Sequence, residues 1–247
     1  MLRKRLVTVL TFNQGVLFRT RNFIPDHRYT ANFVDAWSVD EIVLLDVTRD
    51  PAPCRPHFQA AVSWFAERCF VPLTVGGGVR SLADFEKLLG LGADKVAINT
   101  GAVERPELIA EASRRYGAQC VVLSLDAAPH GDGGYRVRTR FGTRDSGMDP
   151  AAWAARAEAL GAGEILVQSV ERDGTLEGYD NRLHRLVSDA VSIPVLGCGG
   201  AGNWAHFAEG FEEGGLSAVC TTNIYHFTEA SVKSAKAFLK ARGHAVR

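Results

Sequence analysis

The sequence lacks net charge, long apolar runs and any cysteine pattern typical of a metal site. Lys plus Arg and Asp plus Glu both total 28 in 247 residues, so no overall positive field is present to hold a nucleic acid or an acidic membrane surface. No stretch approaches the roughly 20 apolar residues that a membrane-spanning helix needs. The five cysteines are odd in number and show no CxxC spacing. We therefore expect a cytoplasmic protein with reduced thiols, no metal and no cofactor.

The amino-terminal segment MLRKRLVTVLTF has a basic tip and a short apolar run, as a secretory signal peptide does. The apolar run is only about seven residues long, and polar Asn13 and Gln14 follow it without a small-residue cleavage site. We interpret this segment as the first buried strand.

Short runs rich in Val, Ile and Leu recur along the chain, each followed by a turn and then by a segment with helical periodicity. This alternation is typical of βαβ units, and the length suits one eight-stranded α/β barrel. We expect strands at 5–11, 41–47, 71–75, 94–98, 119–126, 164–169, 193–197 and 217–221. We expect helices at 29–36, 57–69, 82–90, 106–116, 150–160, 181–189, 203–213 and 229–242. The segment 132–144 alternates around a Gly-rich turn and predicts a small inserted hairpin.

The chain also repeats at half its length. VPLTVGGGV (71–79) matches IPVLGCGGA (193–201), EIVLLDV (41–47) matches EILVQSV (164–170), and LVTVLT (6–11) resembles VVLSLD (121–126). This repeat predicts a single (β/α)8 TIM barrel, one domain over 1–247, made of two half-barrels at about 1–118 and 119–247. An open doubly wound sheet is the alternative.

Each half carries turns that could bind a phosphate group at the carboxyl ends of the strands. In the first half these turns contain Gly77 and Gly78, and then Asn99 and Thr100. The corresponding turns of the second half contain Gly199, Gly200, Thr222 and Asn223. A glycine pair can also serve only to make a tight turn, but two symmetric pairs suggest one elongated ligand with a phosphate at each end.

One carboxylate is placed for acid–base chemistry. Asp126 ends the fifth predicted strand, where a carboxyl group can exchange a proton with a bound substrate. A helix cap or a salt bridge is the structural alternative. The equivalent position on the first strand holds Thr11, which does not exchange protons near neutral pH, so the repeat supplies no carboxylate pair.

Four charged residues stand at or near strand starts, at the other end of the barrel: Arg5, Glu41, Lys95 and Glu164. Their charges cancel in pairs. Salt bridges that close the barrel floor are one interpretation, and such pairs add little net stability. A gate on the barrel axis is the other.

Several contiguous motifs together resemble the cyclase subunit of imidazole glycerol phosphate synthase, nearly from end to end. The matching stretches are KRLVTVL at the start, DEIVLLDVT (40–48), PLTVGGGVRS (72–81), GADKVAINTGAVERP (92–106), VVLSLDA (121–127), GAGEILVQSVERDGTLEGYD (161–180) and GCGGAGN (197–203). The resemblance implies a glutaminase partner on the amino face, forming a heterodimer. It also implies passage of ammonia up the barrel axis and its addition to a bisphosphorylated ribulose compound.

The sequence departs from the family pattern at the first-strand aspartate, which is Thr11 here. In addition, Arg19 stands where the family prefers lysine, Gln168 replaces a small polar residue, and the loop 22–30 is shorter than usual. These substrate-side changes resemble the diverged paralogues found with surface-polysaccharide genes, which are thought to help deliver nitrogen for acetamidino groups on sugars. A histidine-pathway synthase, such a diverged nitrogen-transfer subunit and a non-catalytic glutaminase-activating partner are the three hypotheses.

Overall fold

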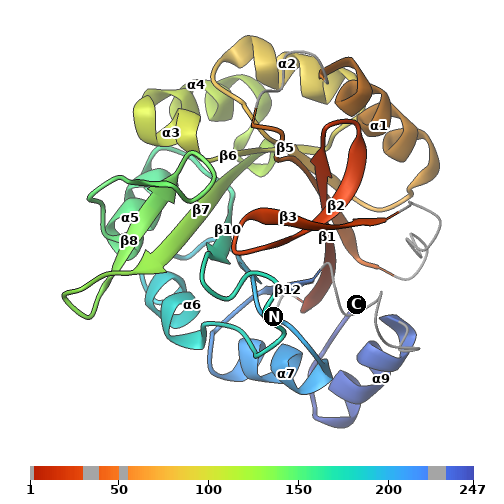
Figure 1. Ribbon diagram of the computed structural model, residues 1–247, viewed down its shortest axis with the longest axis vertical. Helices are drawn as coiled ribbons and strands as arrows, with labels where there is room; N and C mark the ends of the chain where they lie inside the picture. Colours follow the sequence, from red (N-terminus) through yellow and green to blue (C-terminus); the bar gives the residue numbers. More distant parts are fainter. Residues whose placement is uncertain (1–2, 30–38, 50–54, 222–231) are drawn as a thin grey trace.

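The computed structural model describes residues 3–29, 39–49, 55–221 and 232–247. The strand pairings form a closed ring of eight parallel strands, which lies at the centre of the molecule in Figure 1. Each strand pairs with the next along the chain, and the last, β12, pairs with the first, β1. The ring contains β1 (Arg5–Asn13), β4 (Glu41–Asp46), β5 (Leu73–Gly76), β6 (Lys95–Ile98), β7 (Val121–Pro129), β10 (Glu164–Ser169), β11 (Val195–Cys198) and β12 (Ala218–Thr221). The predicted TIM barrel is confirmed, and the open sheet is excluded.

Helices surround the ring on its outer side (Figure 1). Within the described residues they are α1 (Arg55–Arg68), α2 (Leu82–Gly90), the short α3 (Thr100–Glu104), α4 (Glu107–Tyr116), α5 (Pro150–Ala159), α6 (Asn181–Ser188), α7 (Trp204–Glu212) and α9 (Val232–Ala241), and a 3-10 turn lies at Ala118–Cys120. Several begin at side-chain caps that the sequence supplies. Ser81 and Asp84 form a capping box on α2, and Asn203 caps α7. The predicted helices agree within a few residues, except that α3 was missed and 30–36 and 229–231 lie outside the described residues.

Two antiparallel hairpins extend the barrel at its carboxyl end. β1 and β7 are nine residues long, against four to six for the other barrel strands. β1 continues into β2 (Val16–Arg21) and β3 (Ile24–Tyr29), and β7 continues into β8 (Tyr135–Thr139) and β9 (Arg144–Asp145). The second hairpin confirms the predicted insertion at 132–144.

The first hairpin corrects the expectation of a loop at 22–30 and of a helix beginning at residue 29. Its turn, Asn22–Phe23, contains no glycine although both residues have positive φ, at 50° and 61°. β3 contains Pro25, and the register between β2 and β3 shifts at Arg19 and Thr20. A proline and an irregular register both disrupt the alternating pattern by which a strand is predicted.

The apolar residues form two separate cores. The larger lies between the strands and the surrounding helices and includes Phe58, Phe85, Trp153 and Phe207. The smaller fills the inside of the barrel and consists of Val7, Val9, Val43, Ala97, Val122, Leu166, Leu196, Cys198, Ala218 and Cys220. The barrel axis is therefore a packed apolar column, as in other barrels of this size.

Candidate functional site

Four charged side chains close the amino end of the barrel. Arg5 lies 2.8 Å from Glu41 and 2.9 Å from Glu164, and Lys95 lies 2.9 Å from Glu41 and 2.7 Å from Glu164. Each carboxylate thus bridges both cations, and Thr74 donates a further hydrogen bond of 3.0 Å to Glu41. The side chain of Glu41 is only 1% exposed. The structure therefore brings the four predicted residues together in one charged ring.

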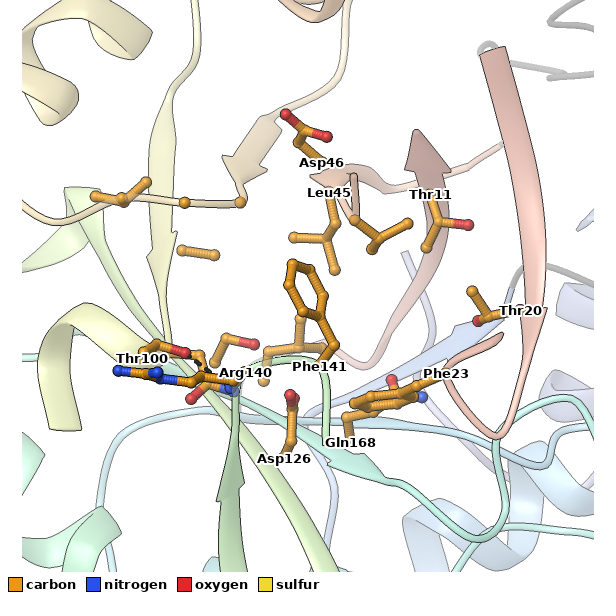
Figure 2. Close-up of a pocket in the computed structure, with 18 of the residues that line it drawn as sticks. Thr11, Thr20, Phe23, Leu45, Asp46, Thr100, Asp126, Arg140, Phe141 and Gln168 are labelled. Atoms are coloured by element: carbon orange, nitrogen blue, oxygen red, sulfur yellow. Dashed lines mark hydrogen bonds between the residues drawn. The ribbon is translucent and has the colours of Figure 1, made fainter. Parts of the chain in front are cut away.

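A cavity of about 220 Å³ opens at the opposite end, where the strands finish (Figure 2). Its floor contains Val9, Ala97, Leu166 and Cys198, which are also the upper part of the apolar column. Seven of the predicted site residues line it: Thr11, Gly77, Gly78, Asn99, Thr100, Asp126 and Gln168. The charged ring and the cavity thus lie at the two ends of the barrel axis.

Asp126 at the end of the fifth barrel strand, β7, is the principal titratable group of the cavity. Burial among protein atoms and, to a smaller extent, the charge of Asp173 raise its pKa, a hydrogen bond from Asn99 lowers it, and the net pKa is about 7. A carboxyl group with such a pKa can donate or accept a proton near neutral pH. Its chemistry fits the predicted acid–base role.

Thr11 occupies the corresponding position of β1 but makes a different interaction. Its side chain is mostly buried, and its hydroxyl donates a hydrogen bond to the carbonyl oxygen of Phe18 on β2. The hydroxyl is thus engaged in attaching the first hairpin to the barrel. In the register of the sheet Thr11 lies opposite Leu45, whereas Asp126 lies opposite Gln168.

Asp173 is a further cavity carboxyl group, beside Asp126 and Asp46, that sequence reasoning missed. It lies in the loop after β10, lines the cavity, and is 9% exposed. Burial raises its pKa, while hydrogen bonds from Phe23, Thr20 and Gln168 counteract the rise. The repeat supplies no carboxylate pair, since Thr11 is the counterpart of Asp126, but the cavity contains carboxyl groups from outside these two positions. The motif ERDGTLEGYD contains Asp173, but it follows the strand end, so the strand-end pattern alone does not indicate it.

The glycine turns are required by packing, whatever they bind. A Cβ on Gly77 would come within 2.4 Å of the carbonyl oxygen of Asp46, and one on Gly200 within 2.1 Å of that of Gly178. A Cβ on Gly199 would come within 2.7 Å of the carbonyl oxygen of Ser169. Gly199 and Gly200 follow β11 and are not among the residues that line the cavity. The close approach of neighbouring loops is thus sufficient to explain these glycines, and phosphate binding remains a prediction.

Two further cavity residues come from the second hairpin and were also missed. Arg140 and Phe141 occupy the β8–β9 turn with positive φ, at 51° and 61°. The backbone N–H of Arg140 donates to the hydroxyl of Thr100 at 3.1 Å, and its guanidinium contacts Glu104 at 3.0 Å. Figure 2 shows Phe23 and Phe141, one from each hairpin, among the residues that surround the cavity. Both hairpins therefore contribute to the cavity wall.

Three predicted site residues cannot be placed. The backbone of Arg19 belongs to β2, but its side chain lies outside the described part of the structure, as do Thr222 and Asn223. Over the described residues, no group of three or more His, Cys, Asp and Glu side chains is arranged to hold a metal ion. No helix within the same residues is long and apolar enough to cross a membrane.

The closed barrel with a titratable carboxyl group at its carboxyl end defines the class: a (β/α)8 barrel with an enzyme-like cavity. Comparison with protein families identifies it further. A family model described as "Histidine biosynthesis protein" matches residues 7–231, which is most of the chain. The chain therefore belongs to the histidine biosynthesis protein family, whose members are typically enzymes of that pathway.

Proposed function

We propose that this protein is the synthase subunit of a glutaminase-dependent complex, similar to the cyclase subunit of imidazole glycerol phosphate synthase. The glutaminase binds the amino face as a heterodimer partner, and ammonia reaches the carboxyl-end cavity, where it reacts with a phosphorylated substrate. The observation that carries the proposal is the placement of a charged ring and a titratable cavity at opposite ends of one apolar column.

The charged ring supports a gate better than a purely structural role. Buried ion pairs contribute little net stability compared with apolar side chains of similar volume, because removing charges from water is costly. Four such charges at the entrance of an otherwise apolar column therefore require another explanation. Neutral ammonia can cross an apolar column more readily than a charged ion, so a ring that opens when the partner docks would admit it.

The substrate in this proposal is held through its phosphate groups. One would bind near Gly77, Gly78, Asn99 and Thr100, where Arg80 and Arg140 also line the cavity. The other would bind near Gly199, Gly200, Thr222 and Asn223. Asp126 would then act on the middle of the substrate as the general acid or base, as its pKa near neutrality permits.

Thr11 favours a second candidate function. Losing one positioned acid or base commonly costs about 10²- to 10⁴-fold in rate, and the hydroxyl of Thr11 is directed to Phe18. A diverged paralogue that transfers nitrogen during acetamidino modification of surface sugars would keep the gate and the phosphate turns while changing the reaction. A non-catalytic activator of a glutaminase would keep only the gate.

The experiment that tests the function uses the purified chain together with a glutaminase subunit from the same genome. We expect the two to co-purify and the rate of glutamine hydrolysis to rise in the complex. With ammonium salts and the histidine-pathway substrate, we expect very weak turnover by the wild type and partial recovery by Thr11→Asp. Failure to bind or activate the glutaminase would refute the partner assignment. Robust cyclase turnover by the wild type would refute the diverged function and favour the histidine pathway.

A further inference from the structure

We propose that Cys198 and Cys220 form an oxidisable dithiol inside the barrel, which a small hydroperoxide entering the cavity converts to a disulfide that links β11 to β12. The proposal is independent of the reaction proposed above, because it rests on the packing of the barrel interior. It begins from the position of the two cysteines: Cys198 is the last residue of β11, and Cys220 is the last but one of β12.

The register of the barrel places the two cysteines side by side. Gly197 of β11 pairs with Val219 of β12, and the next residue of each strand is a cysteine. Both cysteines belong to the apolar core inside the barrel, so their side chains lie on the same face of the sheet. Neighbouring strands lie about 4.8 Å apart, and a disulfide joins Cα atoms that are about 4.4–6.8 Å apart. The two sulfur atoms can therefore be joined while the strands keep their pairing.

The two thiol groups also contact each other. A side-chain hydrogen bond joins Cys220 to Cys198, and the charges of Glu41 and Arg5 act on Cys220 as well. Cys220 thus lies between the charged ring and Cys198. Burial raises the pKa of the Cys220 thiol well above its usual value, and the contact with Cys198 raises it further. A thiol held in its protonated form attacks an oxidant slowly, so Cys220 is unsuited to react first.

Cys198 is the thiol of the pair that an oxidant can reach. It lines the cavity, whereas Cys220 is 1% exposed and is not among the lining residues. The cavity floor around Cys198 is apolar. Hydrogen peroxide and small organic hydroperoxides carry no charge, so they reach such a floor without the cost of desolvating an ion. The oxidant therefore meets Cys198 first, and Cys220 acts as the resolving thiol.

The reaction takes two steps. The sulfur of Cys198 attacks one oxygen of the hydroperoxide, the O–O bond breaks, and the other oxygen leaves with the thiol proton as water or an alcohol. Cys198 is then a sulfenic acid. The sulfur of Cys220 attacks that of Cys198, the S–O bond breaks, and the hydroxyl group leaves as water with the proton of Cys220. The two thiols lose two electrons in total, and the hydroperoxide gains them.

The cross-link would lie directly below two turns of the predicted second phosphate site. Gly199 and Gly200 follow Cys198 in the sequence, and Thr222 follows Cys220 after one residue. A disulfide between the two strands would restrain the starting points of both turns.

The experiment treats the reduced full chain with hydrogen peroxide under native conditions. The remaining thiols are then alkylated, and the chain is digested without reductant for peptide mass mapping. We expect a cross-linked peptide pair that joins Cys198 to Cys220 and lacks two hydrogen atoms. Cys69, which packs against the outer core, and Cys120, in the turn before β7, are internal controls. Both are more exposed than the pair and should form no cross-link within the chain.

Single substitutions test the order of the two steps. In Cys220→Ala, oxidation should stop at a sulfenic acid on Cys198, which dimedone traps. In Cys198→Ala, Cys220 should remain a thiol over the same time, and the control Cys120→Ala should keep the cross-link. Absence of the cross-link in the wild type would overturn the proposal. Labelling of Cys220 in Cys198→Ala as fast as that of Cys198 in Cys220→Ala would do the same.

Thermal unfolding of the wild type provides a measurement without any substitution. We expect the oxidised protein to unfold at a higher temperature than the reduced protein, because a cross-link restricts the unfolded chain. The same peroxide treatment should not raise the unfolding temperature of Cys198→Ala. A lower unfolding temperature of the cross-linked wild type would mean that the disulfide does not fit the native barrel, and it would refute the proposed pair.

Discussion

At the scale of single residues, the two halves of the barrel present unlike groups at equivalent positions. Thr11 and Asp126 occupy equivalent positions in β1 and β7. The hydroxyl of Thr11 attaches the first hairpin to the barrel, whereas the carboxyl group of Asp126 has a pKa of about 7. The environment around Asp126 opposes ionisation, so this residue is placed at a cost to stability. Such a cost is typical of residues retained for chemistry.

The raised pKa of Asp126 predicts a pH-dependent effect of Asp126→Asn on stability. A carboxyl group whose folded-state pKa lies above its unfolded value destabilises the protein increasingly as pH rises between the two values. At pH 8 we expect Asp126→Asn to increase the free energy of unfolding by on the order of 2 kcal/mol, less than the full shift allows because the group partly contacts solvent. At pH 4 the effect should vanish, and activity should be lost at both.

Urea unfolding at several pH values measures this effect. Asp46→Asn is the matched control, because Asp46 also lines the cavity but lies near a cation, Arg55. An Asp126→Asn variant that is less stable than the wild type at pH 8 would contradict the assignment of a destabilising charge.

At the scale of elements, the strand registers of the two halves correspond. In the first half Val7 pairs with Glu41, and at the equivalent position of the second half Val122 pairs with Glu164. Likewise, Ile42 pairs with Leu73 in the first half and Ile165 pairs with Val195 in the second. The charged ring breaks this correspondence. Glu164 in the second half is the equivalent of Glu41 in the first. Lys95 has no charged equivalent: it pairs with Thr74, and in the corresponding pair of the second half Leu196 pairs with Ala218.

The geometry of the ring predicts that Lys95→Met destabilises the protein by about 3 kcal/mol, because two mostly buried carboxylates then share one cation. Adding Glu164→Gln should recover part of the loss by restoring charge balance. Arg115→Met, which removes an exposed pair with Glu86, is the control and should cost less than about 1 kcal/mol.

Denaturant unfolding of the four proteins measures these differences. If Lys95→Met costs no more than Arg115→Met, the ring is not a tightly coupled buried network, and the gate proposal loses its structural basis.

At the scale of the whole molecule, the division into two half-barrels near residue 118 is a prediction. The chain there runs through the short turn Ala118–Cys120 between α4 and β7. Each half alone would expose two unpaired strand edges and part of the apolar column, and such edges promote association. We expect 1–118 and 119–247, produced together, to assemble into a one-to-one complex with the circular dichroism of the intact chain.

Each half produced separately should instead form oligomers, which size-exclusion chromatography can detect. Halves that remain separate monomers when mixed would contradict the division. Superposing the two halves on their paired strands provides a second test, since unequal strand orders would exclude a repeat.

The sequence by itself determined the barrel and the elements that form it, because these follow from local patterns. Val- and Ile-rich runs, helical periodicity and a half-length repeat predict strands, helices and closure, and the charges of Arg5, Glu41, Lys95 and Glu164 recur at strand starts. These signals are encoded over a few neighbouring residues or at a fixed offset, so they can be read without coordinates.

Only the tertiary structure decided how the cavity is completed. The β2–β3 hairpin has a turn without glycine, stabilised by distant Asp173, 150 residues from Phe23, so no local pattern predicts it. The proximity of Asp173 to Asp126 depends on the pairing of β7 with β10 and on Gln168 between them. The raised pKa of Asp126 arises from burial and a neighbouring charge, which are properties of the folded barrel and of no single segment.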